Sequence, residues 1–149
     1  LLDTGGGIKN AMHKIDSHYT FVLNSDILWG QNEKKIFSKM SSIFDPTSMD
    51  SLLCLTSLSK VRGYNGIGDF YFKDKNTIDR YNLKLNDPLV YMGVQIIKKE
   101  LLDTFEEKVF SVNKVWDYAI ECKKLAGFLY NEELFHIGTP KMVKEINEI

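Results

Sequence analysis

The chain has 149 residues, enough for one domain with a hydrophobic core, and its 44% hydrophobic and 26% charged residues are ordinary for a globular protein. The formal net charge of −1 argues against strong attraction to nucleic acid or anionic membranes, and no apolar run is long enough to span a bilayer. The two cysteines lack metal-ligand spacing, and no segment has the pattern of a secretory leader. We therefore expect a cytoplasmic protein that binds neither nucleic acid nor membrane.

The first half of the chain predicts helices alternating with strands. Three glycines at residues 5–7 precede a helix over residues 8–15, where apolar side chains recur at helical spacing. A continuous apolar run over residues 19–26 predicts a buried strand, and residues 32–44 predict a second helix. A second buried strand is expected over residues 51–58.

The second half continues this alternation. Residues 68–83 predict an antiparallel hairpin, residues 89–97 a buried strand and residues 111–124 a helix capped by Ser111. Short strands are expected over residues 125–130 and 133–138, before a last helix over residues 139–149. This order predicts an α/β fold in a single domain, with a Rossmann-like mixed, mainly parallel sheet and helices on both faces.

Asp26 is the first candidate for chemistry. It stands at the carboxyl end of a predicted strand, where open α/β sheets bind their ligands. A carboxylate there could hold a hard cation that itself binds phosphate oxygens. However, the sequence Asn24-Ser25-Asp26 is also typical of a turn, and spacing alone favours a turn or helix cap.

Two further segments could approach a ligand. Gly5, Gly6 and Gly7 would let the backbone come close to an anion or a base edge, although they form neither a dinucleotide fingerprint nor a P-loop. Thr139 opens the last predicted helix, where its hydroxyl could face a phosphate or sugar or simply cap the helix. For His136, the residues alone favour a hydrogen-bonded core histidine over a ligand.

Taken together, these motifs follow the order of one known family. The segments resemble those of the sugar-1-phosphate nucleotidyltransferases, which make nucleotide sugars from a nucleoside triphosphate and a sugar 1-phosphate. The GDF step, the FS-x-N-x-x-WD segment and the GTP ending are most similar to mannose-1-phosphate guanylyltransferases and N-acetylmuramate-1-phosphate uridylyltransferases. The matching segments are LLDTGGGI, TFVLNSDILW, GDF, VYMGVQI, FSVNKVWDYAI and FHIGTP.

The resemblance implies a nucleotidyltransferase (GT-A-like) fold and a role for each matching residue. An aspartate that binds catalytic Mg²⁺ matches Asp26, and the usual second metal ligand, also an aspartate, is replaced by His136. The implied catalytic and metal-binding residues are Asp26 and His136; the implied nucleotide-binding residues are Thr4, Gly5, Gly6 and Gly7; and the implied sugar-phosphate-binding residues are Gly93, Asn113 and Thr139.

His136 is a departure from the usual family pattern. Mg²⁺ prefers oxygen ligands, so an imidazole is a poor replacement for a carboxylate. His136 could instead bind the sugar phosphate, the metal through water, or a softer metal such as Mn²⁺.

The front of the family's domain has no counterpart among these residues. That part carries the LAAGxGTRxxP loop over the triphosphate, a downstream KP lysine and a central first strand. We therefore expect the later part of an N-terminally truncated domain that is inactive by itself. It could pair with a separate N-terminal half of the same enzyme, or be a non-catalytic remnant that binds a nucleotide sugar.

Overall fold

The computed structural model describes residues 1–29 and 33–138. Its main sheet has the strand order β6-β5-β7-β3-β8, and β1 also pairs with β7. A smaller sheet has the order β2-β9-β4. The main-sheet strands are β1 (Tyr19–Leu23), β3 (Ser51–Ser57), β5 (Phe70–Phe72), β6 (Ile78–Arg80), β7 (Leu89–Lys98) and β8 (Leu125–Leu129). The others are β2 (Ile27–Trp29), β4 (Val61–Arg62) and β9 (Leu134–His136).

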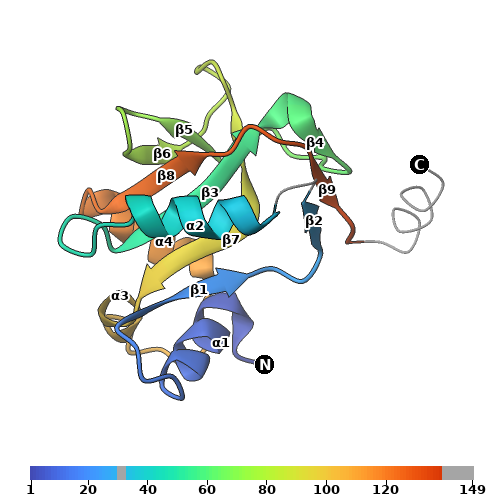
Figure 1. Ribbon diagram of the computed structural model, residues 1–149. Helices are drawn as coiled ribbons and strands as arrows, with labels where there is room; N and C mark the ends of the chain where they lie inside the picture. The colour runs from blue at the N-terminus through green and yellow to red at the C-terminus, as the bar shows by residue number, and fades with distance from the viewer. Residues whose placement is uncertain (30–32, 139–149) are drawn as a thin grey trace.

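Helices cover both faces of the main sheet (Figure 1). Side chains alternate along β3, so Leu52 and Cys54 pack on the face covered by α2 (Glu33–Ile43), and Leu53 and Leu55 on the opposite face. Three helices lie on that opposite face: α1 (Asp3–Met12), α3 (Lys99–Asp103) and α4 (Val112–Glu121). The predicted mixed α/β fold with helices on both faces is confirmed.

The expected predominance of parallel pairing is wrong. In the described main sheet, β7 is antiparallel to β1, β3 and β5, and only β3 and β8 are parallel. Parallel neighbours need a crossover connection. The chain reaches β7 from β3 through a β5–β6 hairpin, whereas α3 and α4 lie between β7 and β8 and carry the chain back.

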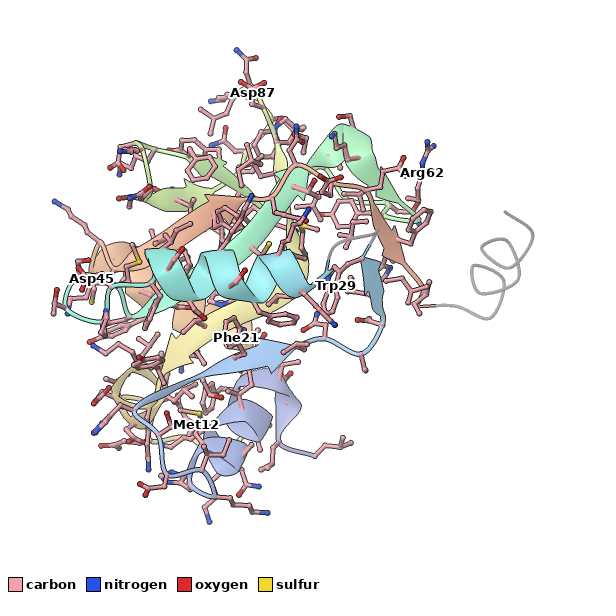
Figure 2. All side chains as sticks on the ribbon, in the orientation of Figure 1. Met12, Phe21, Trp29, Asp45, Arg62 and Asp87 are labelled. Carbon is pink, nitrogen blue, oxygen red and sulfur yellow. The ribbon has the colours of Figure 1, made fainter. Side chains whose placement is uncertain are left out.

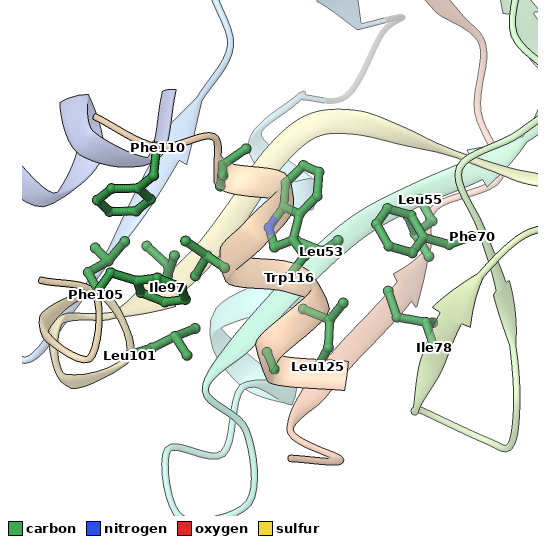
Figure 3. Close-up of a cluster of buried hydrophobic side chains, with 14 of the residues drawn as sticks. Leu53, Leu55, Phe70, Ile78, Ile97, Leu101, Phe105, Phe110, Trp116 and Leu125 are labelled. Carbon is green, nitrogen blue, oxygen red and sulfur yellow. The ribbon is translucent and has the colours of Figure 1, made fainter. Parts of the chain in front are cut away.

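Trp116 of α4 lies at the centre of one core cluster. Figure 3 shows it between the stacked rings of Phe105 and Phe110 on one side and the hairpin residues Phe70 and Ile78 on the other. Its ring meets that of Phe70 edge-on, with 5.7 Å between centroids. The apolar face of this helix was predicted correctly, since Val112, Val115, Trp116 and Ala119 are all buried.

Helix α1 differs from its prediction because it includes the glycines instead of following them. Gly5 and Gly6 are buried, and the backbone N–H of Gly6 donates to the Phe110 carbonyl at 3.1 Å. A Cβ on Gly6 would lie only 2.2 Å from the Lys108 carbonyl oxygen. The glycines thus allow α1 to pack closely on the segment before α4, and this packing outweighs their low helix propensity.

The remaining elements mostly follow expectation. The strand predicted over residues 19–26 ends at Leu23 and is a partly exposed edge strand, not a buried one. Strand β2, helix α3, the 3-10 turn over Leu58–Lys60 and strand β4 were not predicted. The helix expected over residues 139–149 lies outside the described residues. No helix in the part of the chain that the structure describes is long and apolar enough to cross a membrane.

Candidate functional site

Two adjoining cavities open beside the loop after β1. The hairpin cavity, of about 200 Å³, is lined by residues that include Asp69, Arg80 and His136. The helix cavity, of about 550 Å³, lies at the start of α1 and α4 and includes Thr4 and Gly7 in its wall. Four residues line both cavities: Asn24, Tyr91, Asn113 and Trp116. A ligand with two moieties could therefore occupy the two spaces together.

Asp26 and His136 lie together, although they are 110 positions apart in the sequence. Strands β2 and β9 pair Ile27 with His136, which places Asp26 beside the histidine. The Nε2 atom of His136 is 3.5 Å from Oδ2 of Asp26, and the backbone N–H of Ile137 donates to the Asp26 carbonyl at 2.9 Å. Both side chains are partly exposed, at 38% and 48%, so the core interpretation of His136 does not hold.

Asn113 stands at the start of α4 in the wall between the cavities. Its backbone N–H donates to the capping hydroxyl of Ser111 at 3.2 Å. Its side-chain oxygen accepts a hydrogen bond from Nη2 of Arg80 at 3.1 Å. Nδ2 of Asn113 also donates to the Ser111 hydroxyl at 3.4 Å, so the amide is oriented and one Nδ2 donor is left for a ligand oxygen.

The predicted nucleotide-binding segment divides into two pairs. Thr4 and Gly7 line the helix cavity, and Gly7 would have open space around an added Cβ. Gly5 and Gly6 instead face the Phe110 segment and do not line that cavity. The Thr4 hydroxyl also accepts the backbone N–H of Val112 at 2.9 Å, which links α1 to the first turn of α4.

Gly93 contributes by close packing and is not among the lining residues of either cavity. Its φ of +71° lies in the left-handed region, and the register of β3 and β7 shifts beside it. An added Cβ would lie 2.8 Å from Ile27 and 3.1 Å from Asn24. Gly93 therefore lets the loop that carries Asp26 lie directly on β7. Thr139 lies outside the described residues.

The hairpin cavity contains a carboxylate with firm hydrogen-bond partners. Asp69 accepts from the Tyr64 hydroxyl at 2.7 Å and from the Tyr91 backbone N–H at 2.9 Å. Burial, together with the hydrogen bond to this carboxylate, raises the pKa of Tyr64. Burial also raises the pKa of Tyr91, whose hydroxyl makes no hydrogen bond within the described residues. An unpartnered polar atom beside both cavities leaves a hydrogen bond for a ligand or water to make.

Sequence reasoning missed Arg80 and assigned Trp116 to the core alone. Arg80 follows Ile78 by two residues, so both side chains belong to the same face of β6, and Ile78 is buried. The sequence signal for Arg80 was a cation on the inward face of a predicted strand. An arginine is seldom buried unless another group pairs with it.

The metal-binding potential of the site rests on few ligands. Among residues 1–29 and 33–138, no group of three His, Cys, Asp or Glu side chains could hold a metal ion. Asp26 offers a carboxylate, and Mg²⁺ commonly uses one or two protein carboxylates together with substrate phosphates. Asp26 fits that pattern, whereas the imidazole of His136 does not.

The fold is that of the sugar nucleotidyltransferases. It matches the structure of HddC from Yersinia pseudotuberculosis complexed with GMP-PN, with a TM-score of 0.71 and 21% identity, over 99% of this chain and 62% of that one. An inositol-1-phosphate CTP transferase from T. maritima matches with a TM-score of 0.70 and 14% identity, over 99% and 60% of the two chains.

A curated protein is similar in sequence as well. An N-acetylmuramate alpha-1-phosphate uridylyltransferase from Caulobacter vibrioides is 28% identical over 140 residues, which are 94% of this chain and 58% of that protein. No family model matches the sequence. The resemblance to sugar-1-phosphate nucleotidyltransferases is thus confirmed, and the chain spans somewhat more than half the length of the relatives it matches.

Proposed function

We propose that this chain forms part of an enzyme that transfers a nucleoside monophosphate from a nucleoside triphosphate to a sugar 1-phosphate. The observation that carries the proposal is the pair of adjoining cavities, with the Asp26–His136 pair beside one and the start of α1 beside the other. In the reaction, a sugar 1-phosphate oxygen forms a bond to the α-phosphorus of the triphosphate, and the bond to pyrophosphate breaks.

The nucleophile is already anionic, so the protein needs no strong general base. Catalysis then depends on positioning and on neutralising charge. In our proposal, Asn113 and His136 orient the sugar phosphate, and Gly93 and Thr139 shape the sugar site. Thr4 and Gly7 meet the nucleobase and ribose, while Gly5 and Gly6 hold α1 in place.

Enzymes of this class generally use a divalent metal ion, and we propose Mg²⁺ held by Asp26. When bound, the ion would neutralise phosphate oxygens around the α-phosphorus. The two side chains are 3.5 Å apart. His136 would therefore contact the sugar phosphate next to the ion that Asp26 holds. The nucleotide sugar formed would be of the UDP-N-acetylmuramate or GDP-mannose type.

We further propose that additional chain completes the site along β1. Within the described residues, β1 pairs only with β7, and its end residues Tyr19 and Leu23 are 44% and 47% exposed. A further segment, in the same chain or a separate one, could pair with this edge and bring groups for the triphosphate. The alternative is a binding module that holds a nucleotide sugar without turnover.

Pyrophosphate release tests the proposal. The chain would be joined to, or mixed with, the front segment of a nucleotidyltransferase and assayed with a panel of nucleoside triphosphates and sugar 1-phosphates. We expect metal-dependent release that Asp26→Ala lowers at least about a hundredfold in kcat, as for loss of a main electrostatic stabiliser. Asp16→Ala, on an exposed loop residue, is the matched control. Nucleotide-sugar binding without release would support the alternative instead.

A further inference from the structure

The hairpin cavity has polar and apolar groups in its wall. The side chains of Arg80, Asn113 and His136 are among the polar groups, and they suit the sugar phosphate of the proposed reaction. The apolar lining residues belong to, or pack against, a single core cluster: Ile27, Val61, Tyr64, Val90 and Leu134. A phosphate gains nothing from such residues, whereas the C–H bonds on the faces of a sugar ring would pack against them.

Tyr64 is the aromatic residue among these apolar groups. It lies in the loop after β4, which has glycines at positions 63, 66 and 68. Arg62, the last residue of β4, is exposed at the periphery of the molecule (Figure 2), whereas Tyr64 lines the hairpin cavity. Gly63 stands between them with a φ of +78°, in the left-handed region that glycine adopts readily.

Two contacts fix the ring of Tyr64. Its hydroxyl donates to Oδ1 of Asp69 at 2.7 Å, and Oδ2 of Asp69 accepts the backbone N–H of Tyr91 at 2.9 Å. Gly66 lies against the hydroxyl end of the ring, since an added Cβ there would be 2.3 Å from the hydroxyl oxygen and 2.4 Å from Cζ. Because the ring is already ordered, little conformational entropy is lost when a ligand packs against it.

Arg80 and Tyr64 approach the cavity from different core clusters. The guanidinium carbon of Arg80 lies 4.8 Å from the ring centroid of Phe70 and 5.6 Å from that of Trp116, and both rings belong to the cluster on the α4 face. Tyr64 packs on the cluster that α2 covers. A sugar 1-phosphate in this cavity would thus meet phosphate-binding groups and an aromatic ring that separate parts of the fold supply.

Resting on the proposed nucleotidyl transfer, we propose that Tyr64 is a specificity-determining residue whose ring packs against the sugar ring of the acceptor. The flat ring covers the C–H face of the sugar, and its hydroxyl stays paired with Asp69. The ring of Tyr64 therefore stabilises the bound sugar and contributes nothing to the phosphate. A phosphate ester without a sugar ring gains no such contact and binds more weakly.

Direct binding to the 149-residue chain tests this assignment. Calorimetry would give dissociation constants for methyl phosphate, mannose 1-phosphate and N-acetylmuramate 1-phosphate. The constant for methyl phosphate, divided by that for a sugar 1-phosphate, measures what the sugar ring adds to binding. We expect this ratio to be at least about ten in the wild type for one of the two sugars, as for burial of a small apolar surface.

Two variants separate the ring of Tyr64 from its hydroxyl. Tyr64→Phe and Tyr64→Leu both remove the hydrogen bond to Asp69, but only Tyr64→Leu removes the ring. We expect the ratio to stay within about twofold of the wild type in Tyr64→Phe and to fall at least about fivefold in Tyr64→Leu. Gly66→Ala, which displaces the ring without removing it, should also lower the ratio. A residue that served only to hold Asp69 would give the same ratio in the Phe and Leu variants.

The matched control is Tyr81→Leu. The Tyr81 hydroxyl donates to the Leu85 carbonyl at 3.1 Å, and its side chain is not among the lining residues of the cavity, so its loss should leave the ratio unchanged. Thermal unfolding of each variant shows whether the fold is retained. Equal binding of all three compounds by the wild type, or equal ratios in Tyr64→Phe and Tyr64→Leu, would overturn the assignment while leaving the proposed function intact. Binding of none of the three would overturn both.

Discussion

Gly6 and Gly7 are neighbours in one helix, yet their surroundings are opposite. A Cβ on Gly6 would meet the Lys108 carbonyl oxygen at 2.2 Å, whereas one on Gly7 would have nothing within 4 Å. We predict that Gly6→Ala lowers the free energy of unfolding by about 2 kcal/mol, because overpacking exceeds the gain in helix propensity. Gly7→Ala should raise it by about 0.5–1 kcal/mol. Urea titrations of both variants measure this, and equal shifts would contradict it.

The two cysteines also differ in their surroundings. Burial raises the pKa of Cys54 to about 12, whereas Cys122 is exposed. We predict that iodoacetamide at pH 8 alkylates one thiol in the folded protein and two in denaturant. Cys122→Ser should abolish the native labelling, and rapid labelling of Cys54 in the folded state would contradict the prediction. Since the folded pKa is raised, this thiol also makes stability fall as the pH rises above about 9.

At the scale of elements, Thr4 couples two helices that line the helix cavity. Its hydroxyl accepts the Val112 N–H at the first residue of α4, a donor that has no partner within its own helix. We predict that Thr4→Val lowers the free energy of unfolding by about 1 kcal/mol, like loss of a helix cap. Hydrogen exchange should then speed up at Val112. Thr4→Ser retains the hydroxyl and should show neither change.

Elements with strong apolar patterns were predictable, whereas their tertiary setting was not. The spacing of Ile36 and Met40 predicts α2, and both side chains are buried as that pattern requires. For Gly6, local propensity favours a loop, and only the Phe110 segment, about a hundred residues away, makes a helix there favourable. The direction of β7 likewise depends on its partners, because an apolar run does not encode parallel or antiparallel pairing.

The candidate site was also predictable only in part, because some of its residues depend on tertiary packing. Motif order led to Asp26, His136 and Asn113, and the side chains of the first two lie 3.5 Å apart. Arg80 lies in the hairpin predicted over residues 68–83, and its setting depends on aromatic rings and on an asparagine from α4. Such a constellation exists only after the hairpin packs against the helix.

For the whole molecule, the reaction that we propose needs groups beyond those of the two cavities. These 149 residues contain no LAAGxGTRxxP loop, and nothing else in them matches the cations that such a loop places on a triphosphate. We predict that the pure chain releases no pyrophosphate from any nucleoside triphosphate and sugar 1-phosphate with Mg²⁺. A coupled phosphate assay with pyrophosphatase measures this. Metal-dependent release that Asp26→Ala abolishes would show the prediction to be wrong.

The position of β3 in the sheet has a consequence for the order in which the protein is made. This strand pairs on one side with β7 and on the other with β8, so that Leu52 lies opposite both Ile96 and Ala126. When β3 leaves the ribosome, dozens of residues must still be synthesised before β7 or β8 exists to pair with it. Pairing between such distant segments is slow, because a long loop must close before contacts compensate for it. Until β7 and β8 have been made, the apolar side chains of β3 lack their partner strands, and such exposed segments are prone to aggregate.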